Sequence, residues 1–425
     1  MRTIIKIIAA IVFTLMVLEG ISFLVLKKIY LNASATPVFN RELSGYTVFR
    51  NTPDFRYRTF KTDTGQADVR TDDYGFICNE RPTIKKDTNT IRIFLMGGSA
   101  MMSAGQNDVG NCYSAIKNFP HDLYAWDISI SGLLQTCLQQ KFPRKKIQVI
   151  NAASYSFQLH QSILLYLETV SRFKPDLVID MDGFNDIESI YTGNTFQLTE
   201  MMLLNRYVQL ATQKDNIIFK SKTAQLILYA IRRYSDNYSQ SSCGFFVDTA
   251  IYNRAKYNSV KDYLQYSSTC FTEELRQYMN LLQGDGVKFI FVLQPMLVRG
   301  INKQLNTSES RMANEVDVIN PRGAKKWKDN TNPKIDFSVL NGLGISMAGG
   351  QYLTQRYFFD DYLSDKLRQQ VEAKGFIYTD INRDISRIDS SEQYYTDYCH
   401  LTQTGYKFVA KRMADLIIEN KLLEN

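Results

Sequence analysis

Four residues in three short motifs have the side-chain types that nucleophilic catalysis needs. Ser99 ends a Gly-Gly-Ser motif, Asn185 lies in Gly-Phe-Asn-Asp, and Asp397 stands three residues before His400. A serine hydroxyl is a poor nucleophile until a base takes its proton, and His400 can be that base while Asp397 orients the imidazole. Each motif alone is common in turns. Together they predict a serine nucleophile with an oxyanion hole formed by the Ser99 N–H and the Asn185 amide.

Five short apolar runs predict the strands that would bring these residues together. They lie at 91–96, 147–151, 177–181, 287–293 and 376–378. Stretches with helical spacing of apolar residues alternate with them. Strands that alternate with helices form a parallel sheet covered on both faces, and ligands bind at the carboxyl ends of its strands. We therefore expect an α/β fold with a parallel sheet of about five strands, whose carboxyl edge gathers the four residues.

The first 28 residues predict a membrane anchor. A short basic start precedes an apolar run from Ile7 to Leu26, which has the roughly 20 residues needed to cross a bilayer. We expect an uncleaved transmembrane signal anchor over 1–28 and a single-pass membrane protein whose soluble part is extracytoplasmic. A cleaved signal peptide is the alternative, with Ala33-Ser34-Ala35 resembling a cleavage site. Glu19 within the run either has a role in the membrane or is simply tolerated there.

The composition of the 425 residues fits a folded chain with a substantial core, because 44% are hydrophobic and 22% charged. A net charge of +7, without basic clusters interleaved with aromatics, gives no sign of nucleic-acid binding. The three histidines have no metal-ligand spacing, so no metal site is expected, and His121 and His160 read as surface or core residues. Six cysteines fit an oxidising compartment, and proximity suggests the pairs Cys112–Cys137 and Cys243–Cys270.

At these motifs the sequence resembles the SGNH (GDSL-type) hydrolase superfamily, over about 91–190 and 285–425. Ser99 matches the nucleophile of the first block, Asn185 the amide of the third, and Asp397 with His400 the closing D-x-x-H pair. The Leu-Thr-x-x-Gly-Tyr that follows is also similar, and the extended N-terminal part looks like the membrane-anchored bacterial branch. The resemblance implies a flavodoxin-like three-layer α/β/α fold, no metal, no cofactor, and ester hydrolysis or acyl transfer through an acyl-serine.

Two positions depart from the family pattern. Gly98 stands where the first block has Asp, which leaves the nucleophile intact. The second block normally supplies a glycine N–H to the oxyanion, and Ala153 occupies that place here. Alanine still has an N–H, so we expect Ala153 to complete the oxyanion hole with Ser99 and Asn185, provided that its φ is negative.

The rest of the chain is divided by composition. We expect an N-terminal extension packing on the core at 29–90, the two halves of the core at 91–186 and 285–425, and a mostly helical insertion at 187–284. Residues 299–350 are polar and too long for an ordinary connection. They predict a lid or partner-binding loop, or else a surface loop without a role.

An exported enzyme with this chemistry would meet acylated glycans, lipids or small esters. We expect an O-acyl group, in particular O-acetyl, on a cell-envelope or surface glycan. Hydrolysis and transfer to a sugar hydroxyl use the same residues; water exclusion by 299–350 would favour transfer, with a membrane-embedded protein as acyl-transfer partner. The alternative is a catalytically inactive SGNH-like domain that binds glycan or assembles an export complex, against which the four intact residues argue.

Overall fold

The centre of the protein is a six-stranded sheet with the order β12-β11-β10-β6-β9-β5. A computed structural model of the chain describes residues 2–32, 41–44, 46–57, 59, 69–105, 122–186, 221–224, 226–227, 260–297, 299, 304–315, 358–388 and 391–424. The sheet strands are β5 (Ile77–Cys78), β6 (Thr90–Gly97), β9 (Lys146–Asn151), β10 (Leu177–Asp182), β11 (Lys288–Leu293) and β12 (Ile377–Asp380).

Neighbouring strands from β9 to β12 pair in parallel, and only the edge strand β5 runs antiparallel, against β9. The five predicted strands are therefore confirmed as β6, β9, β10, β11 and β12. Their side chains form a nearly continuous apolar run because both faces are covered: all eight residues of β6 and all six of β10 are buried. In chain order the parallel strands lie as 2-1-3-4-5, so the order reverses between β6 and β10. Ligands of such sheets bind at that reversal point.

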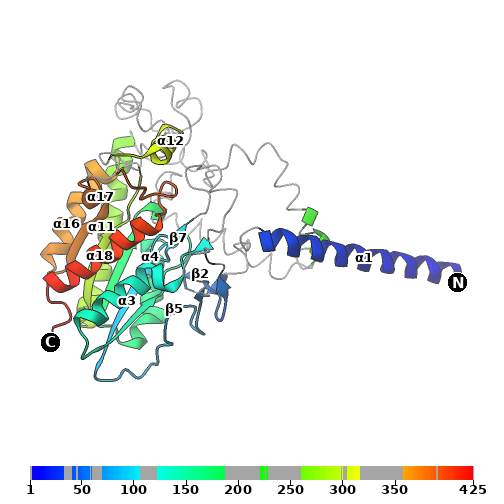
Figure 1. Cartoon of the computed structure of the whole chain (residues 1–425), viewed down its shortest axis with the longest axis horizontal. Coiled ribbons are helices and arrows are strands. Elements are labelled where there is room, and N and C mark those ends of the chain that lie inside the picture. The colour runs from blue at the N-terminus through cyan, green and yellow to red at the C-terminus, as the bar shows by residue number, and fades with distance from the viewer. Residues whose placement is uncertain are drawn as a thin grey trace.

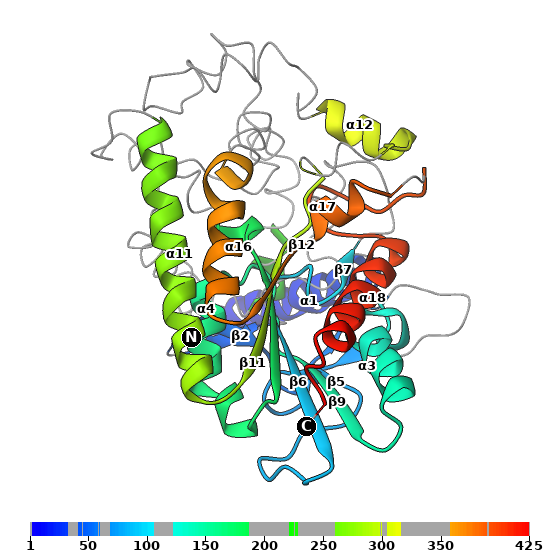
Figure 2. The same cartoon turned by 90° about the vertical axis from the view of Figure 1, so that its left-hand side faces the viewer.

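Helices cover both faces of the sheet (Figure 2). On one side α3 (Ile130–Lys141) and α18 (Gln403–Glu419) pack on each other, and α3 packs on β9. On the other side lie α4 (Leu159–Glu168), α11 (Val260–Gly284) and α16 (Ser364–Ala373). Ser129 and Thr402 accept backbone N–H bonds as N-caps of α3 and α18, which fixes where these helices begin. The expected three-layer arrangement of a mostly parallel sheet is confirmed.

Shorter strands and helices connect the elements of this core or pack around it. The remaining strands are β1 (Arg41–Ser44), β2 (Val48–Asn51), β3 (Arg56–Tyr57), β4 (Val69–Arg70), β7 (Ala104–Gly105) and β8 (Asp122–Leu123). The remaining helices are η1 (Trp126–Ile128), η2 (Val170–Phe173), α12 (Thr307–Glu315), the π-helical η3 (Phe358–Leu363) and α17 (Ile381–Ile385). Within the described part of 29–90, Phe49 and Phe76 belong to the hydrophobic core and β5 joins the sheet. Of the expected insertion, α11 is the long described helix; most of 187–259 and all of 316–357 lie outside the described residues.

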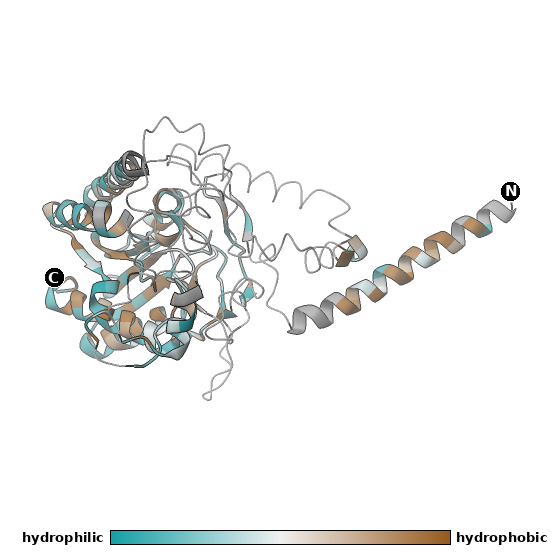
Figure 3. Ribbon diagram, turned by 90° about the horizontal axis from the view of Figure 1, so that it is seen from above, coloured by the Kyte–Doolittle hydropathy of each residue, from teal (hydrophilic) through white to brown (hydrophobic). Residues whose placement is uncertain are grey.

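The N-terminal helix α1 (Arg2–Asn32) extends away from the α/β body (Figures 1 and 3). Glu19 on this helix accepts hydrogen bonds from Ser221 Oγ at 2.9 Å and from the Thr223 backbone N–H at 3.1 Å. A search of the described residues for a helix long and apolar enough to cross a membrane finds none. The transmembrane helix expected over 1–28 is therefore not found.

The proposed disulfide between Cys112 and Cys137 is wrong for this structure, because Cys137 is a free thiol on α3. Proximity in sequence was its sole basis, and α3 uses Cys137 as a half-buried packing residue instead. Cys112 and Cys243 lie outside the described residues, so the pair Cys243–Cys270 stays a prediction.

Candidate active site

Ser99, His400 and Asp397 form a continuous hydrogen-bonded chain. Ser99 Oγ lies 2.7 Å from His400 Nε2, and His400 Nδ1 lies 2.7 Å from Asp397 Oδ2. Ser99 is half-buried, whereas Asp397 and His400 are only 4% and 6% exposed. Ser99 is therefore the most exposed of the three residues, while His400 and Asp397 are shielded from solvent. This is the geometry in which a neutral imidazole accepts the serine proton and the carboxylate stabilises the resulting imidazolium.

The segment after β6 holds Ser99 in place. Gly97 ends the strand with φ +125°, and a Cβ at this position would lie 2.3 Å from the Met181 carbonyl oxygen on β10. Only glycine fits so close an approach. The chain then turns, with the Gly98 carbonyl accepting the N–H groups of Met101 and Met102. The residues after Ser99 are fully buried, so the nucleophile sits on a packed turn rather than on a free loop.

The hairpin-like loop 394–402 carries both other members of the chain. Its base is closed by a hydrogen bond from the Thr402 N–H to the Tyr394 carbonyl at 2.9 Å. Within the loop, Asp397 Oδ1 accepts the backbone N–H of Cys399 at 2.9 Å and of His400 at 2.8 Å. One carboxylate oxygen thus shapes the turn while the other holds the imidazole. The D-x-x-H spacing therefore delivers both groups within one turn, as the sequence predicts.

One buried side chain outside the motifs, Glu309, braces this loop, and a second, Arg299, holds the segment before it to the sheet. Glu309 on α12 is fully buried, and its Oε1 accepts the backbone N–H groups of Tyr394 at 2.8 Å and Tyr395 at 3.2 Å. Arg299, whose side chain is 3% exposed, forms a bidentate ion pair with Asp380 at the end of β12. Segment 299–350 therefore begins with structure that supports the catalytic loop, a feature that composition alone does not reveal.

Asn185 follows β10 and lies directly against the nucleophile turn. Its Nδ2 donates to the Phe157 carbonyl at 2.8 Å, and a Cβ placed on Gly98 would lie 2.5 Å from the same nitrogen. An amide nitrogen carries two N–H groups, so one remains for a ligand beside Ser99. Asp186 holds this turn in place, because its carboxylate accepts the backbone N–H groups of Leu159 and Gly183. The last residue of Gly-Phe-Asn-Asp is thus a positioning residue that sequence reasoning did not single out.

The structure does not present Ala153 as an oxyanion donor. Its φ is not positive, as required, but its N–H donates to Asn151 Oδ1 at 3.0 Å and the residue is fully buried. The prediction for Ala153 is therefore wrong, because the Asn151 side chain turns back onto this N–H. The Ser99 N–H, by contrast, has no acceptor among the residues that the structure describes. Two donors remain for an oxyanion, the Ser99 N–H and the Asn185 amide.

A cluster of carboxyl groups is buried behind the Asn185 turn. Burial raises the pKa of Asp180 to about 7 and that of Glu274 on α11 to about 8. Burial together with neighbouring carboxylates raises the pKa of Asp182 and Asp186 well above the ordinary value. Burial thus favours the protonated form of these carboxyl groups.

His160, the other described histidine, is not part of this arrangement. His160 lies on α4, where burial lowers the pKa of the imidazole to about 4, and it forms no contact with the Ser99 chain among the described hydrogen bonds. His121 lies outside the described residues.

Fold and site together place hydrogen-bonded Ser, His and Asp side chains at the carboxyl edge of a mostly parallel sheet. No protein-family model and no curated protein matches the chain. Solved structures that match include the acetyl xylan esterase AlAXEase, at 12% identity and a TM-score of 0.36, over 77% of this chain and 100% of that one. A second is the acetylxylan esterase Axe2 from Geobacillus stearothermophilus, at 12% identity and a TM-score of 0.33, over 76% of this chain and 92% of that one. A third is LAE5, an alpha/beta hydrolase from the metagenome of Lake Arreo, Spain, at 13% identity and a TM-score of 0.34, over 79% of this chain and 97% of that one. At such values the function has to be argued from the site itself.

Proposed function

We propose that this protein is a serine-dependent ester hydrolase or acyltransferase of the SGNH type. The observation that carries the proposal is the unbroken chain from Ser99 Oγ through both ring nitrogens of His400 to Asp397, with two links of 2.7 Å. Distances in this range match those required between a nucleophile, its base and the group that orients the base.

The geometry supports the following sequence of events. Ser99 Oγ attacks the ester carbonyl while His400 Nε2 takes the hydroxyl proton, and Asp397 stabilises the imidazolium at Nδ1. The carbonyl oxygen becomes an oxyanion that accepts hydrogen bonds from the Ser99 N–H and the free N–H of Asn185. His400 then gives its proton to the leaving alkoxide, which departs as an alcohol and leaves an acyl-serine. Water or an acceptor hydroxyl, activated by the same imidazole, releases the acyl group and regenerates Ser99.

The substrate we propose is an O-acyl group, in particular O-acetyl, on a cell-envelope or surface glycan. This follows from an extracytoplasmic, membrane-attached location, which we also propose. Support for attachment comes from α1, whose large apolar side chains are exposed, including Phe13 and Leu24 at 64% each. Fractionation of cells that express the full chain tests this: the full chain is expected with the membranes, and a variant lacking 1–32 is expected in the soluble fraction.

The test of the chemistry is labelling of the purified full chain with a serine-directed organophosphonate, read by intact mass. A single adduct on the wild type that is absent from Ser99→Ala, with p-nitrophenyl acetate turnover lost in the same variant, is the expected result. Equal labelling or equal turnover in Ser99→Ala would refute the assignment. A folded chain without adduct or turnover would point instead to an inactive glycan-binding or assembly module.

Hydrolysis and transfer are separated by supplying an acceptor. With a soluble oligosaccharide present, a transferase shifts acyl groups from p-nitrophenyl acetate to the sugar, whereas a hydrolase releases acetate at an unchanged rate. Mass spectrometry of the oligosaccharide distinguishes the two outcomes.

A further inference from the structure

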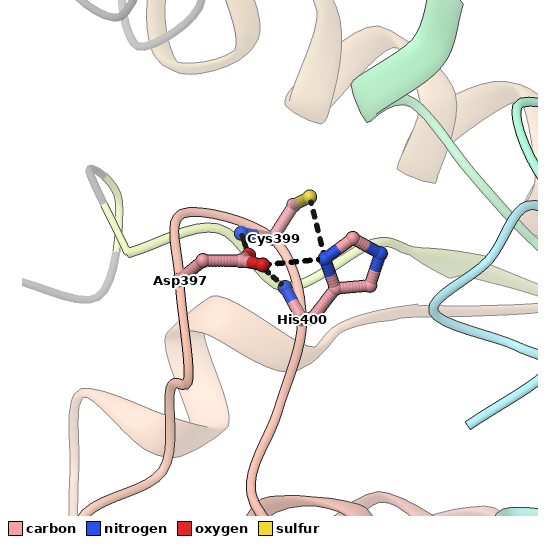
Figure 4. A group of neighbouring side chains, drawn as sticks. All are labelled: Asp397, Cys399 and His400. Carbon is pink, nitrogen blue, oxygen red and sulfur yellow. Dashed lines mark hydrogen bonds and ion pairs between the residues drawn. The ribbon is translucent and has the colours of Figure 1, made fainter. Parts of the chain in front are cut away.

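The sulfur of Cys399 lies on the same side of the catalytic imidazole as Asp397. Cys399 Sγ is 3.6 Å from His400 Nδ1, the nitrogen that also contacts the Asp397 carboxylate at 2.7 Å. Figure 4 shows the thiol and the carboxylate approaching this one nitrogen from different directions. Among the described residues, these three side chains form the one group of His, Cys and acidic ligands whose donor atoms all lie within 4.8 Å of one another.

The ligand types match a thiophilic divalent cation. Thiolate sulfur, imidazole nitrogen and carboxylate oxygen are the three protein ligands of Zn²⁺, with bonds of about 2.3, 2.0 and 2.1 Å in a tetrahedral arrangement. Such bonds separate sulfur from nitrogen by about 3.6 Å and nitrogen from oxygen by about 3.4 Å. The observed distance from Sγ to Nδ1, 3.6 Å, already fits. The distance from Nδ1 to Asp397 Oδ2, 2.7 Å, would have to lengthen by about 0.7 Å.

We propose that Asp397, Cys399 and His400 form an inhibitory site for Zn²⁺ or a similar thiophilic cation, on the Nδ1 side of the catalytic imidazole. Asp397 Oδ2 shifts from hydrogen bonding Nδ1 to ligating the metal, and water completes the tetrahedron. All three residues are at most 7% exposed, so the cation reaches them only when the loop opens, and inhibition develops slowly.

The consequence for catalysis follows from the tautomer. With Nδ1 protonated, Nε2 has a free lone pair and can accept the Ser99 proton. A cation on Nδ1 displaces that proton, and the neutral ring then carries its hydrogen on Nε2. Cys399 also releases its thiol proton on binding, so the metal exchanges for protons. An Nε2 that already bears hydrogen cannot act as the base, and the cation therefore lowers kcat rather than competing with the ester.

Co²⁺ binding tests the site without relying on enzymatic activity. The full chain titrated with CoCl₂ is expected to show the near-ultraviolet charge-transfer band of a cobalt–thiolate bond. The same band should appear in Cys137→Ala, which removes the free thiol of α3 and serves as the matched control. It should be absent from Cys399→Ala and Cys399→Ser. A wild type without the band, or a Cys399 variant that retains it, would overturn the proposal.

Inhibition provides the second arm and rests on the proposed esterase function. Each protein is preincubated with buffered free Zn²⁺, and its activity is divided by its own activity in EDTA. Loss of even an outer-shell partner weakens a metal site about 10–100-fold, so Cys399→Ala should need at least about tenfold more Zn²⁺ for half-inhibition than the wild type or Cys137→Ala. Equal sensitivity of all three would overturn the proposal. If the chain proves to have no turnover, the Co²⁺ titration decides alone.

Discussion

Replacement of Gly98 by alanine should disable the oxyanion hole without touching the Ser99–His400 bond. The new Cβ would lie 2.5 Å from Asn185 Nδ2, whereas its next neighbours, the Phe157 carbonyl oxygen and Asn185 Cγ, are at the ordinary distances of 3.5 and 3.7 Å. To reach ordinary contact the amide nitrogen must retreat by about 1 Å. That retreat pulls it away from the oxyanion position and strains its 2.8 Å bond to Phe157.

The expected cost is that of one oxyanion donor. Removal of such a donor lowers kcat about 10²–10³-fold, or about 2.7–4 kcal/mol of transition-state stabilisation. The assay is p-nitrophenyl acetate turnover by the wild type, Gly98→Ala, Asn185→Ala and the double variant. Because the Cβ acts through the amide, its effect should largely disappear once Asn185 is alanine, and the cycle should be strongly non-additive.

Gly284→Ala is the matched control, since a Cβ at the end of α11 meets nothing within 4 Å and the position has no positive φ. It should leave kcat unchanged. Full kcat in Gly98→Ala would show that the amide is not needed where the structure places it. A Gly98→Ala cost that persists in the Asn185→Ala background would show that the substitution acts on the turn itself.

Three further outcomes are expected. Burial raises the pKa of Glu274 from 4.5 to about 8. Between these pH values Glu274 keeps its proton in the folded chain and loses it in the unfolded chain, so the free energy of unfolding should fall as pH rises from about 4.5 to 8. The free energy of unfolding is measured in urea at pH 5 and at pH 9. Glu274→Gln should make the difference between the two pH values smaller by several kcal/mol, whereas Glu273→Gln, which alters the exposed neighbour, should leave it unchanged. Glu309→Ala should lower kcat by up to about 100-fold with little change in KM, because loop 394–402 loses the acceptor of its Tyr394 N–H. Glu309→Gln keeps an acceptor oxygen and should retain most of the wild-type kcat. An equal loss of kcat in both variants would contradict a bracing role for Glu309. Asp397→Asn should lower kcat about 10⁴-fold through the wrong tautomer of His400 while far-ultraviolet circular dichroism stays unchanged, and near-normal kcat would contradict the role of Asp397.

The strands and the meeting of Ser99, His400 and Asp397 were predictable because their signals are local. Parallel strands are buried on both faces, so each appears as an apolar run, and β6 and β10 were located to within one residue at each end. The active residues follow strand ends or share one turn, so sheet topology brings them together without further information.

Contacts between distant segments were not predictable. No pattern in the sequence says that Glu309 accepts the N–H of Tyr394, because the pairing joins residues 85 positions apart. The same holds for the cluster of carboxyl groups: the sequence places Asp180 in a buried strand, but it does not show that Glu274 on α11 lies near the same group of carboxylates. The transmembrane helix predicted over 1–28 is not found, and nothing in the sequence pointed to the contact of α1 with Ser221.

Each of the two positions that depart from the family pattern has its own geometric setting. At Gly98 the missing side chain leaves the space that the Asn185 amide occupies, since a Cβ there would lie 2.5 Å from Asn185 Nδ2. At Ala153 the N–H is held by Asn151, whose Nδ2 donates at 2.8 Å to the Met101 carbonyl of the nucleophile turn. The segment after β9 therefore supports the turn that carries Ser99, and its Ala153 N–H is not directed at an oxyanion. If the proposed reaction holds, two donors remain for the oxyanion, and the packing around Gly98 that positions the Asn185 amide should matter for the rate.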